Sequence, residues 1–459
     1  MKDENHMNLH DSPRTRLILQ SAIPNMFYRL AAPNMLAVIV ISLVTFSEAW
    51  YIGKVNTVAL AGLAIVFPFQ TLMGMMGNGG MGNGTASALS RTIGKNDFKR
   101  AQSVIWHSAL INFLLSLIYL ICLGIFSRSI FDLFGASEEV TSQAVLFSRI
   151  FFGLAPFIWL YFWMKSVYRG LGAIQILARL DIVASVIQLV LSGALTLGWG
   201  FFPSLGLLGP AIAAVICQGF AGVAMLCWFI SGKFEISLKI VSLDFDVARD
   251  ILKVGGMGVL LASNIALTIM LTTRFVADFG TEAIAGYGVC GRLEQMFIPL
   301  AFGVGGVLVV IVGTNFGATQ YERARKSARF GALIIALVST LIGVILALFP
   351  SLWIDLFTKE LGAFAIGSVY LRIVGPVFGL FAGGQTLSFA SYGTGSMIIP
   401  VLGGMYRVFI TTIFGLSIAY FSLDISFLFL GVTIGMIGWA IILSLNMVSK
   451  GWNPEKTID

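Results

Sequence analysis

The feature that constrains the fold most is a series of apolar runs, each about 20 residues long and nearly free of charge. An α-helix of that length crosses the hydrocarbon core of a bilayer, which is ~30 Å thick. The predicted spans lie near residues 30–53, 57–80, 103–126, 143–168, 180–201, 206–231, 252–277, 283–314, 329–350, 364–390, 398–421 and 425–448. The sequence therefore predicts an all-α integral membrane protein with twelve transmembrane helices.

Composition also places most of the chain in lipid. The 459 residues are 57% hydrophobic and 11% charged, whereas soluble domains carry about 25% charged residues. The net charge of +7 does not indicate nucleic-acid binding, because the basic residues lie in short loops between the apolar runs. The cysteines lie within apolar runs without metal-ligand spacing, so we expect neither a disulfide nor a metal site. They are Cys122, Cys217, Cys227 and Cys290.

The distribution of Lys and Arg predicts the topology. With twelve spans, both chain ends lie on one side of the membrane, and the segments on that side hold 21 Lys and Arg residues. The opposite loops hold only Lys54, Arg128 and Lys359. Cytoplasmic loops are enriched in Lys and Arg, so both termini are predicted to be cytoplasmic. We expect a multi-pass protein of the cell inner or plasma membrane, without a cleavable signal peptide.

The two halves of the chain repeat one another at a shift of 223 residues, which aligns Gly94 with Gly317 and Arg149 with Arg372. Each half starts and ends in the cytoplasm, so the repeats are parallel and related by an axis along the membrane normal. Such repeats surround a central cavity with a substrate site and work by alternating access. The predicted parts are an N-terminal tail (1–29), two six-helix lobes (30–231 and 252–448), a linker (232–251) and a C-terminal tail (449–459).

The first span, PNMLAVIVISLVTFSEAWYIG, begins at Pro33 and contains one carboxylate, Glu48. A charged side chain in the bilayer costs at least ~3 kcal/mol, so such residues usually line a polar cavity or an ion path. Thr45 and Asn34 share the helical face of Glu48 and form a polar stripe with it. Glu48 is the first candidate functional residue, and a Glu paired with one Arg for structural reasons is the alternative. We expect Pro33, and Pro299 in the eighth span, to be helix hinges.

A second acid, Glu294, lies near the centre of the eighth span. Arg407 or Arg274 is its predicted partner, and a structural ion pair is as consistent with the sequence as a coupling role. Phe69 and Met73 lie one turn apart on the second span, where flexible and broad side chains suit a promiscuous apolar cavity. A lipid-facing stripe has the same spacing. The residues assigned to the substrate cavity are Glu294, Asn34, Met73, Phe69 and Arg407.

The stretch GNGGMGNGT at 77–85 is similar in composition to a phosphate-binding loop. It lacks the following Lys and Ser/Thr, and it comes from an apolar helix rather than from a strand. We therefore expect it to permit close helix packing or to break the helix.

Two longer stretches resemble the multidrug and toxic compound extrusion (MATE) family. They are PNMLAVIVISLVTFSEAWYIGKVNTVALAGLAIVFPF and IAGYGVCGRLEQMFIPLAFGVGGVLVVIVGTNFGATQYERAR. The resemblance covers nearly the whole chain, with IFDLFG, YRGLGAIQ, GLLGPAIAAVICQ, WIDLF and SYGTGSMIIP in family order. It implies an exporter of bulky, often cationic organic compounds, driven by the inward flow of sodium ions or protons. The family's first helix usually carries an Asp between a Pro and a Gly, and Glu48 occupies that position between Pro33 and Gly53.

Other positions depart from the family pattern. The Asn and Asp that usually complete a cation site on the fifth helix read here as Gln188 and Ser192, and an expected Thr reads as Ala214. Sodium needs about six hard oxygen ligands, whereas a proton needs one carboxylate, so we favour protons over sodium as the coupling ion. The predicted coupling residues are Glu48, Gln188, Ser192 and Thr45, with no cofactor besides the ion.

Other classes of function fit less well. A membrane enzyme would need a convergent set of His, Asp, Glu or Cys, and none is visible, so we expect no enzyme. A flippase for lipid-linked oligosaccharide or another polyprenyl-phosphate substrate remains the alternative, although it should have a more basic cavity. The acidic-arginine signature of the major facilitator fold and a channel filter motif are missing. The expected partners are small organic molecules and membrane lipid, and the chain is expected to be a monomer.

Overall fold

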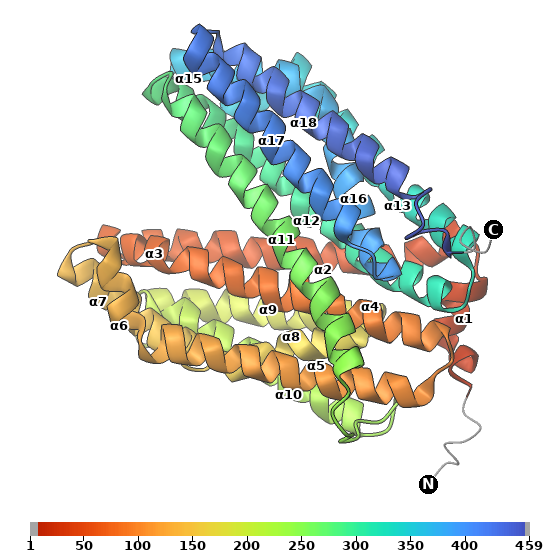
Figure 1. Cartoon of the computed structure of the whole chain (residues 1–459). Helices are drawn as coiled ribbons and strands as arrows, with labels where there is room; N and C mark the ends of the chain where they lie inside the picture. The colour runs from red at the N-terminus through yellow and green to blue at the C-terminus, as the bar shows by residue number, and fades with distance from the viewer. Residues whose placement is uncertain (1–7, 455–459) are drawn as a thin grey trace. The chain divides into compact units, whose positions relative to one another are not determined.

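The computed structural model describes residues 8–454, and every regular element in that range is a helix (Figure 1). Eleven helices are long and apolar enough to cross a membrane. A bent pair, α7 (Glu138–Phe151) with α8 (Ala155–Gly170), provides the twelfth candidate span. The prediction of an all-α membrane protein with twelve spans is therefore confirmed.

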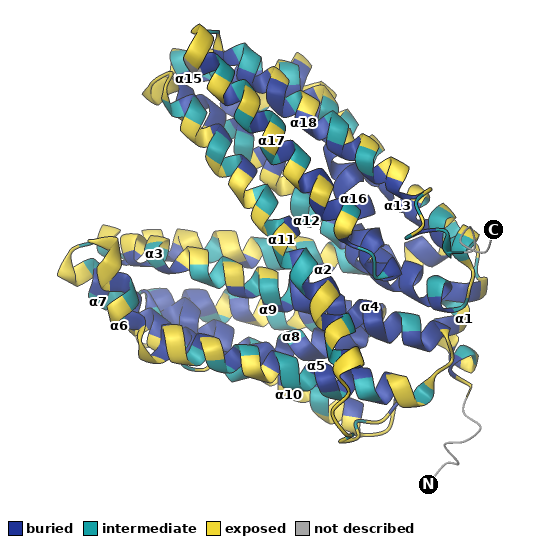
Figure 2. Cartoon of the chain, in the orientation of Figure 1, coloured by how far each residue is buried: buried dark blue, intermediate teal, exposed yellow. Residues whose placement is uncertain are grey.

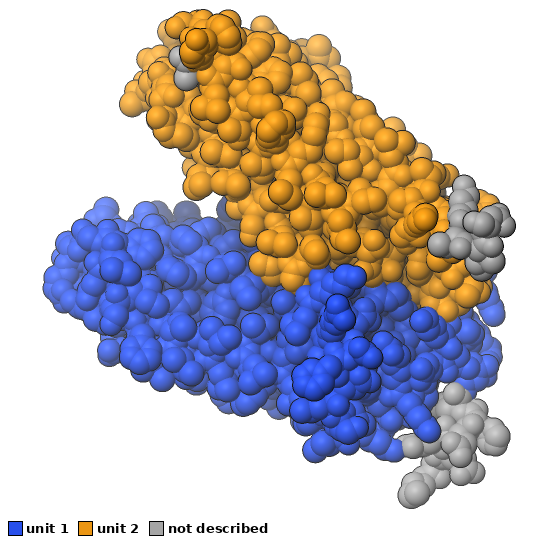
Figure 3. Space-filling model, viewed as in Figure 1, with its two compact units in different colours: residues 1–21, 28–255 blue, residues 22–27, 256–459 orange. Residues whose placement is uncertain are grey.

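The chain divides into two compact units, which Figure 3 distinguishes by colour. Unit 1 comprises residues 1–21 and 28–255, and unit 2 comprises residues 22–27 and 256–459. The division runs through two continuous helices, α2 (Ile23–Gly53) and α11 (Phe245–Ala277), rather than through the predicted linker 232–251. Unit 1 also holds α1 (Pro13–Gln20), α3 (Thr57–Gly74), α4 (Met81–Gly94), α5 (Phe98–Tyr119), α6 (Ser127–Phe131), α7, α8, α9 (Ile174–Leu197) and α10 (Leu208–Ile230). Unit 2 also holds α12 (Thr281–Gly317), α13 (Tyr321–Leu348), α14 (Ser351–Ile354), α15 (Leu361–Val374), α16 (Phe378–Thr394), α17 (Ile398–Phe421) and α18 (Ile425–Asn446).

The helix bounds follow the internal repeat. A shift of 223 residues moves both bounds of α7 onto those of α15, and it moves Phe98 at the start of α5 onto Tyr321 at the start of α13. The same shift moves Gly94, the last residue of α4, onto Gly317, the last residue of α12. Helices α4 and α16 are buried over almost their whole length (Figure 2). The two halves therefore fold into corresponding series of helices, each with its own core.

The glycine-rich stretch at 77–85 lies within one long helical span. A π-helix, η3 (Met75–Gly80), joins α3 to α4, so the second span continues to Gly94 and is longer than the predicted 57–80. A Cβ at Gly77 would collide with the ring of Phe162 on α8. The missing side chain thus permits close helix packing, which is one of the two outcomes that the sequence predicts.

The segment expected as an N-terminal tail contains the folded helix α1, which packs on unit 1. Leu9, just before α1, is buried, and its N–H donates a hydrogen bond to Oδ1 of Asn96 at 2.7 Å. Arg14 of α1 forms an ion pair with Glu235, which follows α10. These contacts attach the N-terminal segment both to the connection between α4 and α5 and to the connection between α10 and α11.

A close approach of two backbones in unit 2 makes Gly343 sensitive to substitution. A Cβ at Gly343 on α13 would collide with the carbonyl oxygen of Gly375, which follows α15. We expect Gly343→Ala to lower the free energy of unfolding by about 1–3 kcal/mol, because overpacking forces the two backbones apart. Thermal unfolding in detergent measures the effect. The matched control is Gly288→Ala on α12, where a Cβ has no neighbour within 4 Å, and equal losses in both variants would contradict this explanation.

Candidate functional site

Glu48 lies on α2 within unit 1 and is partly buried. The side-chain amide of Gln188 on α9 donates a hydrogen bond to Oε1 of Glu48 at 3.0 Å. Gln218 on α10 donates in turn to Oε1 of Gln188 at 3.4 Å. A carboxylate and two amides from three helices therefore form a continuous polar chain inside unit 1.

Two oxygen atoms lie beside this chain. Ser192 lies one turn beyond Gln188 on α9, is fully buried, and has its hydroxyl within reach of the Glu48 carboxyl. Within residues 8–454, Oε1 of Gln218 has no hydrogen-bond partner. A buried polar atom left without a partner costs about 1–3 kcal/mol, so such atoms often mark a functional site. Sequence reasoning did not single out Gln218, although it lies one turn after Ala214 on the same helix.

Glu48 differs from the other acids in the middle of spans because it has no cationic partner among residues 8–454. Asp181 pairs with Lys165, and Glu294 pairs with Arg407. The alternative prediction of a Glu paired with one Arg for structural reasons is therefore not what the structure shows. An amide side chain can donate to a charged carboxylate or accept from a protonated carboxyl. The surroundings of Glu48 thus accommodate both protonation states.

The polar stripe predicted for α2 is only partly buried. Thr45 is exposed, so the structure does not bring it into the chain formed by Glu48 and the two glutamines, and its assignment as a coupling residue stays a prediction. Asn34 is partly buried. Helices α2 and α12 both continue through their internal prolines, Pro33 and Pro299. Their role as hinges remains a prediction.

A buried ion pair between Glu294 of α12 and Arg407 of α17 lies inside unit 2. The hydroxyl of Tyr370 donates to the other carboxylate oxygen of Glu294 at 3.1 Å. The predicted contact of Glu294 with Arg407 is therefore confirmed. Arg274, the other candidate partner, pairs instead with an acid one turn later in the chain. Assignment of Glu294 and Arg407 to the substrate cavity remains a prediction.

Met73 belongs to the packed core of unit 1, and Phe69 is half-buried against that core. Met73 is only 1% exposed, and the ring of Phe69 packs edge-on against Phe131 with 5.8 Å between the centroids. An open cavity or a lipid-facing stripe would leave these side chains uncovered. The burial of Met73 therefore argues against its assignment to the substrate cavity, whereas Phe69 keeps an uncovered part and its assignment stays a prediction.

A second buried polar cluster in unit 1 was not predicted. The Asp181 carboxylate on α9 accepts a hydrogen bond from the hydroxyl of Tyr161 at 2.6 Å and lies 2.8 Å from the ammonium of Lys165. All three side chains are buried. Lys165 lies near the end of the predicted span 143–168, and no contact with Asp181 was predicted for it. The spacing of Asp181, Ser185 and Gln188 on one helical face was the signal that could have revealed the cluster.

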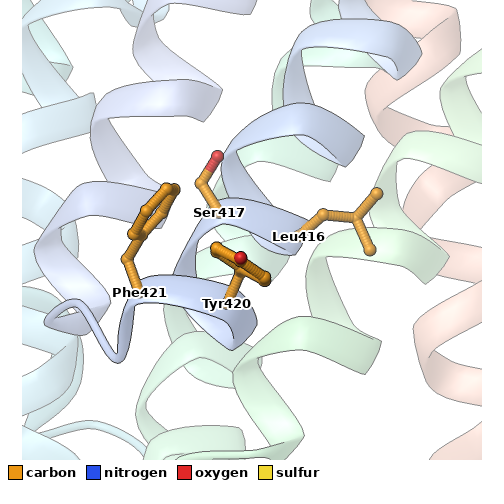
Figure 4. A pocket seen from close by; sticks show the side chains of 4 residues that line it. All are labelled: Leu416, Ser417, Tyr420 and Phe421. Carbon is orange, nitrogen blue, oxygen red and sulfur yellow. The ribbon is translucent and has the colours of Figure 1, made fainter.

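A pocket at the end of α17 is not a convincing binding site. It is lined by Leu416, Ser417, Tyr420 and Phe421, all from one helix (Figure 4). Tyr420 is 82% exposed and Phe421 is 66% exposed. Binding sites are usually concave and formed by groups that converge from several elements. This pocket is therefore a hollow on the surface of unit 2.

Comparisons with known proteins show the family of this chain. A family model described as MatE matches residues 33–193 and 260–421. The probable multidrug resistance protein YoeA of Bacillus subtilis is 24% identical over 76% of this chain and 76% of its own length. The FAD transporter of Shewanella oneidensis is 23% identical over 79% of this chain and 80% of its own. A crystal structure of MATE in complex with MaD3S aligns with a TM-score of 0.88 at 20% identity, over 97% of this chain and 99% of that one. The family model matches well over half of the chain, which therefore belongs to the MatE family of membrane transporters and is not an enzyme.

Proposed function

We propose that this transporter exports organic compounds from the cytoplasm in exchange for protons, with Glu48 as the coupling carboxylate. The observation that carries the proposal is the set of contacts of Glu48, which include an amide and, within residues 8–454, no cationic side chain. An acid inside a membrane span is costly when it is ionised without a counter-charge. Binding of a proton removes that cost and requires no additional ligand.

Coupling requires the bound ion to change which arrangement of the helices is favoured, because a ligand shifts an equilibrium only by its differential affinity. Charged Glu48 favours a wetted, polar arrangement, whereas neutral Glu48 tolerates a dry one. Pro33 lies on the same helix and removes one backbone hydrogen bond, so the helix bends more easily there. We therefore propose that protonation of Glu48 changes the bend of α2, and that alternating access follows from this change.

The relatives support a small organic substrate. One is named a probable multidrug resistance protein and another an FAD transporter, so bulky, often cationic compounds are our first proposal and a dinucleotide is the second. The flippase alternative is less favoured, because Glu294 neutralises Arg407, one of the few basic groups available to hold a phosphate. The asymmetry of Lys and Arg supports a cell inner or plasma membrane location with both termini in the cytoplasm.

Transport measurements on purified protein in proteoliposomes test the proposal. Export of ethidium or a fluoroquinolone is measured with a pH gradient and a sodium gradient imposed separately. We expect the pH gradient alone to drive accumulation, because a proton is the only ligand that Glu48 needs. Accumulation driven by sodium at equal pH on both sides would refute proton coupling. A lack of transport with either gradient, in protein that is folded, would refute antiport of these compounds.

A further inference from the structure

One face of α9 is polar and buried over several turns. Asp181, Ser185, Gln188 and Ser192 follow one another at intervals of three or four residues, and none is more than 8% exposed. Residues at this spacing lie above one another on a helix, with about 5–6 Å between neighbouring Cβ atoms. A membrane helix rarely buries such a row, because each polar group must find partners away from water. The row therefore connects the surroundings of Glu48 with those of Asp181.

Asp181 and Glu48 lie at different depths. Gln188, which contacts Glu48, is seven residues beyond Asp181, or about 10 Å further along α9 by helical rise. The topology proposed above places the start of α9 at the cytoplasmic side and the end of α2 at the outer side. Asp181 is thus in the inner half of the span, and Glu48 is in the outer half.

The groups around Asp181 differ from those around Glu48. One carboxylate oxygen accepts from Tyr161, and the other contacts the ammonium of Lys165. Arg169, one turn beyond Lys165 on α8, is also buried, and its guanidinium donates to Asn83 at 2.8 Å. The acid near the cytoplasmic side therefore faces positive charge, whereas the acid near the outer side faces amides.

We propose that Asp181, positioned by Lys165 and Tyr161, is the group that releases the coupling proton to the cytoplasm. This inference rests on the proposed proton antiport through Glu48. A proton that leaves the Glu48 carboxyl passes along Gln188 and Ser185, with water filling the gaps, and binds the Asp181 carboxylate. Asp181 then gives the proton to cytoplasmic water, so both carboxylates return to their charged form and one proton has crossed.

The positive charge of Lys165 bears on which ion can use this route, because its ammonium lies 2.8 Å from the Asp181 carboxylate. The same ammonium repels a sodium ion, and both carboxylate oxygens are already engaged. The route therefore suits a proton and excludes sodium. A purely structural ion pair would share the burial and the distances, but it would have no effect on proton movement in a folded protein.

The test compares proton influx with substrate exchange in proteoliposomes. The double variant Asp181→Asn with Lys165→Met removes both charges, so that no unpaired buried ion remains. We expect substrate-driven proton influx, followed with a pH-sensitive dye inside the vesicles, to fall at least about tenfold. Exchange of labelled for unlabelled substrate across the same membrane requires no net proton movement, and we expect it to be unchanged.

Ser185→Ala interrupts the row between the two acids without touching the ion pair, so it decides the question if the double variant does not fold. We expect it to lower proton influx at least about threefold. The matched control is Ser90→Ala on α4, another fully buried serine of unit 1, whose hydroxyl donates only to its own helix. We expect this control to transport protons at the wild-type rate.

Parallel measurements on Glu48→Gln separate the release role of Asp181 from the coupling role of Glu48. Loss of proton influx in Glu48→Gln, with wild-type influx in the folded double variant and in Ser185→Ala, would overturn only the role of Asp181. Wild-type influx in Glu48→Gln would instead overturn the proposed coupling site itself. An equal loss of influx and of substrate exchange in the variants at 181 and 185 would show a structural role and would also overturn the release function.

Discussion

Replacing Glu48 with Gln is expected to reduce gradient-driven export at least about 100-fold while leaving folding and substrate binding intact. Gln has nearly the same shape as Glu and can still form a hydrogen bond with Gln188, but it cannot bind and release a proton. The variant should therefore behave like the permanently loaded transporter. Export driven by a pH gradient in proteoliposomes, together with binding of a fluorescent substrate in detergent, measures the two effects.

The control for this variant is Glu48→Asp, which keeps a carboxylate one methylene shorter. We expect it to retain part of the activity, because the proton-binding group survives at a slightly different position. Export at the wild-type rate by the Gln variant would refute the coupling role of Glu48. Loss of substrate binding together with transport would show that Glu48 contributes to the substrate site rather than to coupling alone.

Replacing Arg407 with Met is expected to lower the free energy of unfolding by about 3–5 kcal/mol, because it leaves the Glu294 carboxylate buried without a counter-charge. Arg407 is 2% exposed and Glu294 is 3% exposed, so neither group can turn toward water without rearrangement of unit 2. Thermal unfolding in detergent and the yield of monodisperse protein measure the loss. A wild-type melting temperature for Arg407→Met would contradict the importance of this pair.

Two controls separate the effect of the unpaired buried charge on stability from other effects of the substitution. The double variant Arg407→Met with Glu294→Gln removes both charges, and we expect it to recover most of the stability that the single variant loses. Arg274→Met breaks the exposed pair with Asp278, whose side chains are 66% and 51% exposed. Exposed pairs contribute about 0–1 kcal/mol, so this variant should be almost neutral.

The number of spans and the internal repeat could be predicted because they depend on long patterns. Each span is recognised from an average over about 20 residues, and single exceptions do not change the result. The repeat was visible from identities such as Gly94 with Gly317, and these residues end corresponding helices in the structure. The predicted end of the second span, at residue 80, was wrong. The glycine and asparagine residues there suggest a break in the helix, whereas close packing against Phe162 holds the helix together.

The candidate site was only partly predictable, because burial depends on neighbours that are distant in sequence. The contact of Gln188 with Glu48 joins residues 140 positions apart, and it was expected only from a family pattern. Thr45 shares the helical face of Glu48, yet it is exposed because no neighbouring helix covers it within unit 1. The pair of Lys165 with Asp181 was missed, because Asp181 lies on another helix and the charge pattern alone could not pair them.

The docking of α1 on unit 1 also affects the order in which the chain completes its fold during synthesis. Arg14 precedes its partner Glu235 by 221 residues, and Leu9 precedes Asn96 by 87 residues. At a synthesis rate of about 5–20 residues per second, Arg14 waits roughly 10–45 s before Glu235 exists. Until then, the end of α4 and the start of α5 have only part of their cover. The attachment of α1 therefore follows insertion of α10, and protection of residues 9–20 from a protease would report when the ribosome-bound chain has completed unit 1.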